Sequence, residues 1–204
     1  PKILFPPEYP YTSSTTKILK ENFAEMYDEC RSLMRLDSND LVVDIGSNDG
    51  NLLSNFKDEH RVQGVTPEEI GKIAISKGIP TIISYFGKEA VKTILAERGH
   101  AKVITATNVF AHIDGVNEIV KCILELLDQK GVFITECHYL ESFVKILQYD
   151  TIYHEHLMYY SLHSLKYLLE QHGLEIFHTK QIPTHGGSIR AYVSRKGNFP
   201  VKTT

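Results

Sequence analysis

The chain has 204 residues, of which 42% are hydrophobic and 23% charged, which is typical of a globular protein with one sizeable core. Its net charge of −3 argues against a general nucleic-acid binder. We expect no signal peptide and no membrane segment, because no apolar run approaches the ~20 residues that span a bilayer. The cysteines, Cys30, Cys122 and Cys137, are odd in number and widely spaced, which predicts reduced thiols in a cytoplasmic protein.

The N-terminal part reads as an arm followed by a helix. Residues 1–10 hold four of the eight prolines, so we expect an extended arm there. Apolar side chains at helical spacing predict a helix over residues 17–35. We therefore divide the chain into an arm and helix, residues 1–36, and a core, residues 37–204.

Residues 41–53 read as a buried strand, a glycine turn and a helix that begins near Gly50. Gly46 and Gly50 permit positive φ or the close approach of a ligand. The dinucleotide fingerprint fails, because its second glycine is replaced by Asn48. Asp44 before the first glycine, with small polar residues after it, suits a ligand that carries an ammonium group and no phosphate, as S-adenosylmethionine does. A turn that needs glycine for geometry alone is the alternative.

A second strand is predicted over residues 62–65. Thr66, Pro67 and Glu69 then match a helix start, with Thr66 as N-cap and Glu69 completing a capping box. Nucleotide-binding α/β folds usually place a ribose-binding acidic residue about twenty residues beyond the first glycine. Thr66 stands there, so either Glu68 takes over this role or the ribose is held less tightly.

Strands and helices continue to alternate along the chain. We predict strands at 81–83, 101–106 and 131–136, helices at 87–97 and 116–127, and a helix capped by Ser161 and ended by Gly173. The last two strands, 174–179 and 188–194, read as an antiparallel pair. The pattern predicts an α/β fold with a doubly wound, seven-stranded, mostly parallel sheet that has one antiparallel strand and helices on both faces.

His154, Glu155 and His156 lie in the densest cluster of titratable residues. A metal site completed by His112, His138 or His185 is one interpretation, but an extended His-Glu-His segment would point its carboxylate away from both imidazoles, so we expect no metal. A histidine-containing surface loop is another.

The third interpretation of this cluster is acid–base catalysis. An imidazole, with an unperturbed pKa near ~6.5, can accept a proton at neutral pH while a carboxylate fixes its tautomer. Tyr153 could supply a hydroxyl to a developing oxyanion. Such groups are needed where a carbon acid must first be deprotonated.

Four motifs, residues 43–50, 108–113, 148–156 and 183–190, resemble those of the sugar C-methyltransferases that methylate C3 of nucleotide-activated 4-keto-deoxysugars. The resemblance covers nearly the whole chain from Tyr9 onward. It implies a Rossmann-like class I methyltransferase fold, S-adenosylmethionine as cofactor and a nucleotide-sugar substrate.

The resemblance also implies roles for single residues. His156 would be the base that removes the C3 hydrogen, with Glu155 orienting it or relaying the proton. Tyr153 and His112 would stabilise the enolate, and Tyr11 would contact the substrate.

On the cofactor side, the resemblance implies that Gly46, Asn48 and Asp49 cradle the methionine part. Phe86 and Asn108 would lie near the adenosine.

Members of this family usually carry a cysteine-rich zinc module before this core and an α/β domain after it, and we expect this chain to have neither. A partner domain or subunit would then complete the sugar-nucleotide site. Two alternatives remain open: a small-molecule O- or N-methyltransferase, and a non-catalytic module that binds the cofactor or supports an assembly.

Overall fold

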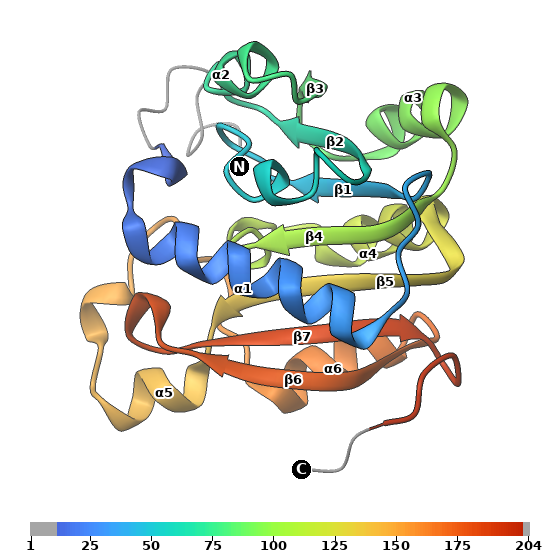
Figure 1. The fold of residues 1–204 in the computed structure, drawn as a ribbon. Coiled ribbons are helices and arrows are strands. Elements are labelled where there is room, and N and C mark those ends of the chain that lie inside the picture. The colour runs from blue at the N-terminus through green and yellow to red at the C-terminus, as the bar shows by residue number, and fades with distance from the viewer. Residues whose placement is uncertain (1–11, 202–204) are drawn as a thin grey trace.

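The computed structural model describes residues 12–201, which form a seven-stranded sheet with helices on both faces (Figure 1). The spatial order is β3-β2-β1-β4-β5-β7-β6. Neighbours from β3 to β5 pair in parallel, whereas β7 is antiparallel to both β5 and β6. This confirms the predicted sheet. Its strands are β1 (Leu41–Ile45), β2 (Arg61–Thr66), β3 (Thr81–Ile83), β4 (Ala101–Thr107), β5 (Leu127–His138), β6 (Leu174–Ile182) and β7 (Ser188–Arg195).

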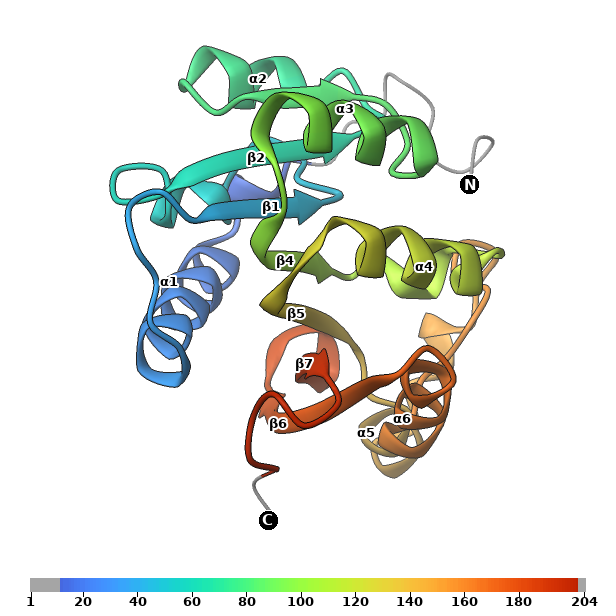
Figure 2. The same cartoon turned by 90° about the vertical axis from the view of Figure 1, so that its right-hand side faces the viewer.

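Two hydrophobic cores lie on the two faces of the sheet (Figure 2). One face is covered by α1 and α2, and the other by α3, α4 and α6. None of the helices within residues 12–201 is long and apolar enough to cross a membrane. The helices are α1 (Lys17–Leu33), α2 (Gly71–Ser76), α3 (Lys88–Arg98), α4 (Val116–Leu126), α5 (Leu140–Lys145) and α6 (Leu162–Glu170).

The prediction of a helix that begins near Gly50 is wrong, because that stretch forms only turns and the short 3-10 helix η2 (Leu53–Asn55). Polar side chains in this stretch compete with the backbone N–H groups for the carbonyls that a helix would use. Ser54 Oγ donates to the carbonyl of Gly50 at 2.8 Å, and Asn55 Nδ2 donates to that of Leu52 at 3.1 Å. The chain thus passes from β1 to β2 without a regular helix.

Thr66 does not cap a helix, so that prediction is also wrong. It is the last residue of β2, and α2 begins only at Gly71. The Thr66 hydroxyl donates to Glu68 Oε2 at 2.7 Å, and Glu69 pairs with Lys72 at 2.9 Å. Both side chains of the expected capping box therefore have other partners.

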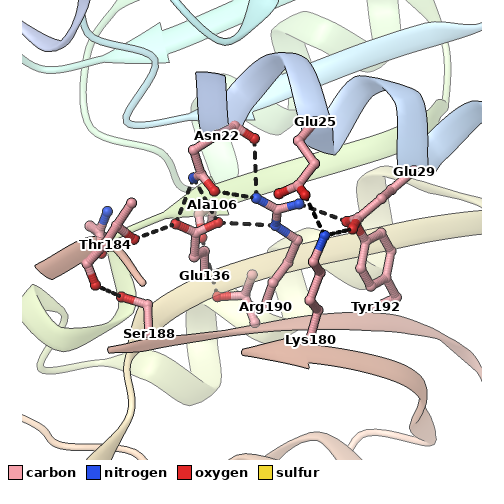
Figure 3. Close-up of polar contacts among 12 residues, drawn as sticks. Asn22, Glu25, Glu29, Ala106, Glu136, Lys180, Thr184, Ser188, Arg190 and Tyr192 are labelled. Carbon is pink, nitrogen blue, oxygen red and sulfur yellow. Dashed lines mark hydrogen bonds and ion pairs between the residues drawn. The ribbon is translucent and has the colours of Figure 1, made fainter. Parts of the chain in front are cut away.

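A buried ionic network fastens α1 to the sheet (Figure 3). The fully buried guanidinium of Arg190 in β7 donates from Nε to Glu136 of β5 at 3.0 Å and from a terminal nitrogen to Glu29 of α1 at 2.6 Å. Asn22 of α1 donates to Glu136 at 2.9 Å and accepts from Arg190 at 2.6 Å. Since every charge in this set has an opposite partner, the network fixes where α1 crosses the strands.

Candidate active site

A cavity of about 540 Å³ opens at the edge of the sheet where the parallel strands end. Residues that follow β1, β2, β3 and β4 line it, and so does the last residue of β5. Because β7 runs the other way, its beginning reaches the same edge and brings His185 with it. The cavity lies where the strand order reverses around β1 and β4, the place at which open α/β sheets bind ligands.

The glycine turn after β1 forms the floor of the cavity. Gly46 has a φ of +74°, and a Cβ at this position would lie 2.6 Å from Cγ2 of Val109. The backbone N–H of Ser13 donates to Asn48 Oδ1 at 3.0 Å, so the segment before α1 closes over the turn. The Ser47 hydroxyl is buried without a hydrogen-bond partner among the described residues, and it lies against Gly64 of β2, where a Cβ would meet it at 2.5 Å.

Asp44, at the end of β1, provides a buried carboxyl group at this cavity. Burial raises its pKa to about 7, although the Thr105 hydroxyl, which donates to Asp44 Oδ1 at 2.7 Å, acts in the opposite direction. A cationic ligand beside this group would favour its ionised form. The site can therefore receive the ammonium group that the sequence suggested.

Glu68 lines the cavity beyond β2, whereas Thr66 does not. Burial raises the pKa of Glu68, and the hydrogen bond from Thr66 lowers it. Tyr85 and Phe86, which follow β3, form the adjoining wall. The carboxylate expected at the end of β2 is thus present two residues later, with Thr66 as its hydrogen-bond donor.

Two other predicted cofactor residues lie behind the lining. Asp49 is fully buried and accepts from Ser13 Oγ at 2.7 Å and Lys77 Nζ at 3.0 Å. Burial raises its pKa, but hydrogen bonds, including these two, hold it below its usual range. Gly50 has a φ of +78°, and a Cβ there would meet Ile79 at 2.6 Å. Both residues shape the turn rather than border the cavity, and Tyr11 lies outside the described residues.

Four histidines line the opposite side of the cavity. The ring centre of His156 lies 5.1 Å from that of His112 and 5.0 Å from that of His138. The ring of His138 lies 5.3 Å from that of His185. Four segments far apart in the sequence thus bring four imidazoles into one row.

Hydrogen bonds define which nitrogen of each central histidine carries a proton. Nδ1 of His156 lies 2.9 Å from the carbonyl oxygen of Thr151, and Nδ1 of His112 lies 2.7 Å from that of Glu155. A carbonyl oxygen only accepts, so both Nδ1 atoms carry hydrogen and the neutral rings keep their lone pair on Nε2. The Tyr153 ring lies 4.5 Å from that of His156.

The segment around these residues is a turn, so the expected extended geometry is wrong. The N–H of His156 donates to the carbonyl of Tyr153 at 3.1 Å, which closes the turn. Tyr153, Glu155 and His156 line the cavity, whereas His154 is exposed and does not. Among residues 12–201, no group of three or more His, Cys, Asp or Glu side chains is arranged to hold a metal ion.

Backbone strain is concentrated at this cavity. Asn48, Asn108 and His185 line it and have φ values of +50°, +56° and +54°. Residues with side chains rarely adopt this conformation, and those that do gather at functional sites. Asn108 Nδ2 lies 3.4 Å from Nε2 of His185, so two of these residues face each other.

The sequence indicated His138 and His185 only as possible metal ligands, and it did not indicate Ser13 and Tyr85 as site residues. His138 ends a parallel strand, which was the available signal for its position. His185 could have been placed only by knowing that β7 is antiparallel to β5 and pairs His138 with Ser188.

The fold and site define a class I methyltransferase: a seven-stranded sheet with a reversed last strand and a glycine turn after β1 at the switch point. Residues 18–179 match the family model of a methyltransferase domain. The chain belongs to this methyltransferase domain family and is an enzyme of a class that uses S-adenosylmethionine.

Known proteins of this type are similar to the chain. C-methyltransferase NovU from Streptomyces niveus is 35% identical over 196 residues, which are 95% of this chain and 46% of that protein, so the chain spans about half its length. Magnesium protoporphyrin IX methyltransferase from Synechocystis PCC 6803, solved with bound SAH, has a TM-score of 0.65 at 14% identity, with 88% of this chain and 84% of that one covered. A S-adenosylmethionine-dependent methyltransferase from Clostridium acetobutylicum ATCC 824 also gives 0.65 at 14% identity, with 87% and 92% covered.

Proposed function

We propose that this protein transfers a methyl group from S-adenosylmethionine to a carbon next to the keto group of a nucleotide-activated deoxysugar. One observation carries the proposal: His156 lines the same cavity as the glycine turn, and its Nδ1–H is held by the Thr151 carbonyl. The basic atom of His156 is therefore Nε2. The 35% identity to a C-methyltransferase and the motifs in residues 148–156 and 183–190 support the carbon acceptor and the sugar.

The reaction requires a base because a C–H bond is not nucleophilic. The keto group acidifies the neighbouring C–H, and Nε2 of His156 accepts that proton as the enolate forms. The cofactor supplies an electrophilic methyl group on its sulfonium. The enolate carbon then forms the new C–C bond as the methyl–sulfur bond breaks, leaving a thioether and a protonated His156.

Charge develops on the substrate oxygen during this step. Tyr153 and His112 lie next to His156; Tyr153 supplies an O–H group to the enolate oxygen, and His112 stabilises its negative charge when the His112 ring is protonated. The pKa of His112 is lowered by burial and by His156, while the Glu155 carbonyl and carboxylate act in the other direction. Glu155 thus favours the protonated form of His112 when negative charge appears beside it. Tyr11 would contact the sugar.

On the cofactor side, we assign Asp44 and Asn48 to the methionine ammonium and carboxylate region. Asp49 and Gly50 support the turn from behind, and Gly46 lets the ligand approach the backbone. The carboxylate of Glu68, oriented by Thr66, accepts hydrogen bonds from the ribose hydroxyls, while Phe86 and Asn108 border the adenine. The sugar nucleotide would also contact a partner domain or subunit, in a cytoplasmic setting.

The test is turnover with 4-keto-6-deoxyhexoses linked to thymidine, uridine or guanosine diphosphate, each deuterated at C3. We expect mass spectrometry to show a gained methyl group together with loss of the C3 deuterium. His156→Ala should abolish both changes while calorimetry still detects S-adenosylmethionine binding.

His163→Gln, on the exposed surface of α6, is the matched control and should leave turnover unchanged. Methylation with the C3 deuterium retained would instead indicate an O- or N-methyltransferase. Absence of cofactor binding by the unmodified protein would contradict the proposal and favour a non-catalytic module that supports an assembly.

A further inference from the structure

The proposed reaction leaves one proton in the site at each turnover. The cofactor loses a positive charge as its sulfonium becomes a thioether, and the C–H proton remains on Nε2 of His156. The other ring nitrogen is held by Thr151 at 2.9 Å, and a carbonyl oxygen cannot pass a proton on. The proton must therefore leave from Nε2 before His156 can act again.

We propose that His138 and His185 form an exit path that carries this proton from His156 to solvent; this inference rests on the proposed function. His156 and His138 have ring centres 5.0 Å apart, and His138 and His185 have ring centres 5.3 Å apart. No direct hydrogen bond joins these rings among the described residues, so one water between each pair of nitrogens would relay the proton. His185 is exposed at the far end, so the path ends in solvent.

The surroundings of His138 suit a proton carrier. A neutral imidazole accepts a proton at one nitrogen while it donates from the other. The pKa of His138 is lowered to about 4 by burial and by His185, His156 and His112, so the ring is neutral at pH 7 and does not trap the proton.

His185 is held in a position that permits both of its tautomers. Asn108 Nδ2 lies 3.4 Å from Nε2 of His185, and Asn108 Oδ1 has no hydrogen-bond partner among the described residues. Rotation of this amide presents either a donor or an acceptor to the ring. Although His185 is exposed at the surface, partial desolvation where it lines the cavity lowers its pKa, as does His156, whereas Glu136 raises it. Glu136 belongs to the network that holds Thr184 beside His185.

The other histidine beside His156, His112, does not offer an exit. His112 donates from Nδ1 to the carbonyl of Glu155 at 2.7 Å, and the backbone of Asn108 also faces this ring. Because carbonyl oxygens cannot carry the proton further, the row of histidines continues only through His138.

The experiment measures the first and the later turnovers separately in rapid-quench assays with the thymidine-diphosphate-linked 4-keto-6-deoxyhexose. Before the first turnover His156 has not yet received a proton from the substrate, so His138→Gln and His185→Asn should retain the normal rate of methyl transfer. Later turnovers should slow by about tenfold or more and recover when imidazole is added to the buffer. His163→Gln is the matched control, and cofactor binding measured by calorimetry verifies folding of each variant.

Equal later turnovers in the unmodified protein and both variants would overturn the exit path. So would a first turnover that slows as much as the later ones, because His138 would then act on the reacting atoms. If the unmodified protein methylates the sugar without losing the C3 deuterium, both the proposed function and the exit path fail. In that case His156→Ala should leave turnover intact, which distinguishes it from failure of the exit path alone. In the resting protein, His185→Asn should also shift the ¹⁵N resonances of His138. Unchanged resonances would show that the two rings are not coupled and would contradict the exit path.

Discussion

The guanidinium of Arg190 and the carboxylate of Glu136 form an ion pair of 3.0 Å between two side chains that are both completely buried. They lie opposite each other in the antiparallel pairing of β5 with β7. Glu136 also accepts from Asn22 of α1, so the pair connects the sheet with the helix whose residues Leu19 and Phe23 line the cavity. The motif over residues 183–190 therefore includes Arg190, whose charge stabilises the fold, as well as His185, which lines the cavity.

Replacing Arg190 by Met should lower the free energy of unfolding by about 3–5 kcal/mol, because Glu136 would remain buried without a cation. Glu136→Gln should cost less, since Arg190 keeps its 2.6 Å pair with Glu29. The double variant should lose less than the sum of the two single losses. Urea unfolding measures all three values. Lys92→Ala, which breaks an exposed pair, is the control and should change stability by less than about 0.5 kcal/mol.

Asp44→Asn should separate stability from cofactor binding. The folded protein holds a proton on Asp44 up to about pH 7, whereas the unfolded chain loses it near pH ~4. The native state therefore binds more protons in this window, and the stability of the unmodified protein falls as pH rises through it. Asn carries no such charge, so the variant should have the higher melting temperature at pH 8 and nearly the same one at pH 4.

The same substitution should remove the partner of the ligand ammonium group. Binding of S-adenosylmethionine to the unmodified protein should strengthen as pH rises toward 7, because the ligand requires the ionised form of Asp44. Asp44→Asn should lose this binding at every pH, as calorimetry would show. A variant that binds as tightly as the unmodified protein would remove Asp44 from the cofactor site.

The sequence predicted elements whose stability comes from their own side chains. In the strand Leu41–Ile45, residues 41–43 are apolar on both faces, and the helix Leu162–Glu170 has its own cap, in which Ser161 accepts from the N–H of Ser164 at 3.1 Å. The prediction of a helix after Gly50 was wrong because the side chains of Ser54 and Asn55 donate hydrogen bonds to nearby carbonyls. The spacing of apolar residues gives no indication of such bonds.

For the cavity, residues that follow parallel strands were predictable, since such strand ends meet at one edge of the sheet. Gly46 and Asn108 are of this kind, Asp44 is the last residue but one of β1 itself, and all three line the cavity. The row of histidines was anticipated only as a possible metal site, and its order was not predictable, because the register that brings His185 to His138 depends on the pairing of β7 with β5.

Glu68→Gln should weaken binding of S-adenosylhomocysteine by roughly tenfold, because a charged acceptor for the ribose hydroxyls becomes a neutral amide. Thr66→Val should have a smaller effect, since it removes only the 2.7 Å hydrogen bond that orients the carboxylate. The matched control is Glu69→Gln, an exposed neighbour paired with Lys72, which should bind normally. Calorimetry measures all three. Equal affinities for Glu68→Gln and the control would show that the ribose is held elsewhere.

Gly46→Ala should cost more stability than Gly78→Ala, although the two glycines have nearly equal φ values of +74° and +79°. At Gly78 a Cβ meets nothing within 4 Å, so only the backbone penalty of about 1–2 kcal/mol applies. At Gly46 the new Cβ would lie 2.6 Å from Cγ2 of Val109, and the clash adds to that penalty. In the double variant, Val109→Ala should therefore restore only that part of the free energy of unfolding by which Gly46→Ala loses more than Gly78→Ala. Urea unfolding measures each variant, and equal losses at the two glycines would mean that Val109 moves aside freely, so that the turn could tolerate a side chain facing the cavity.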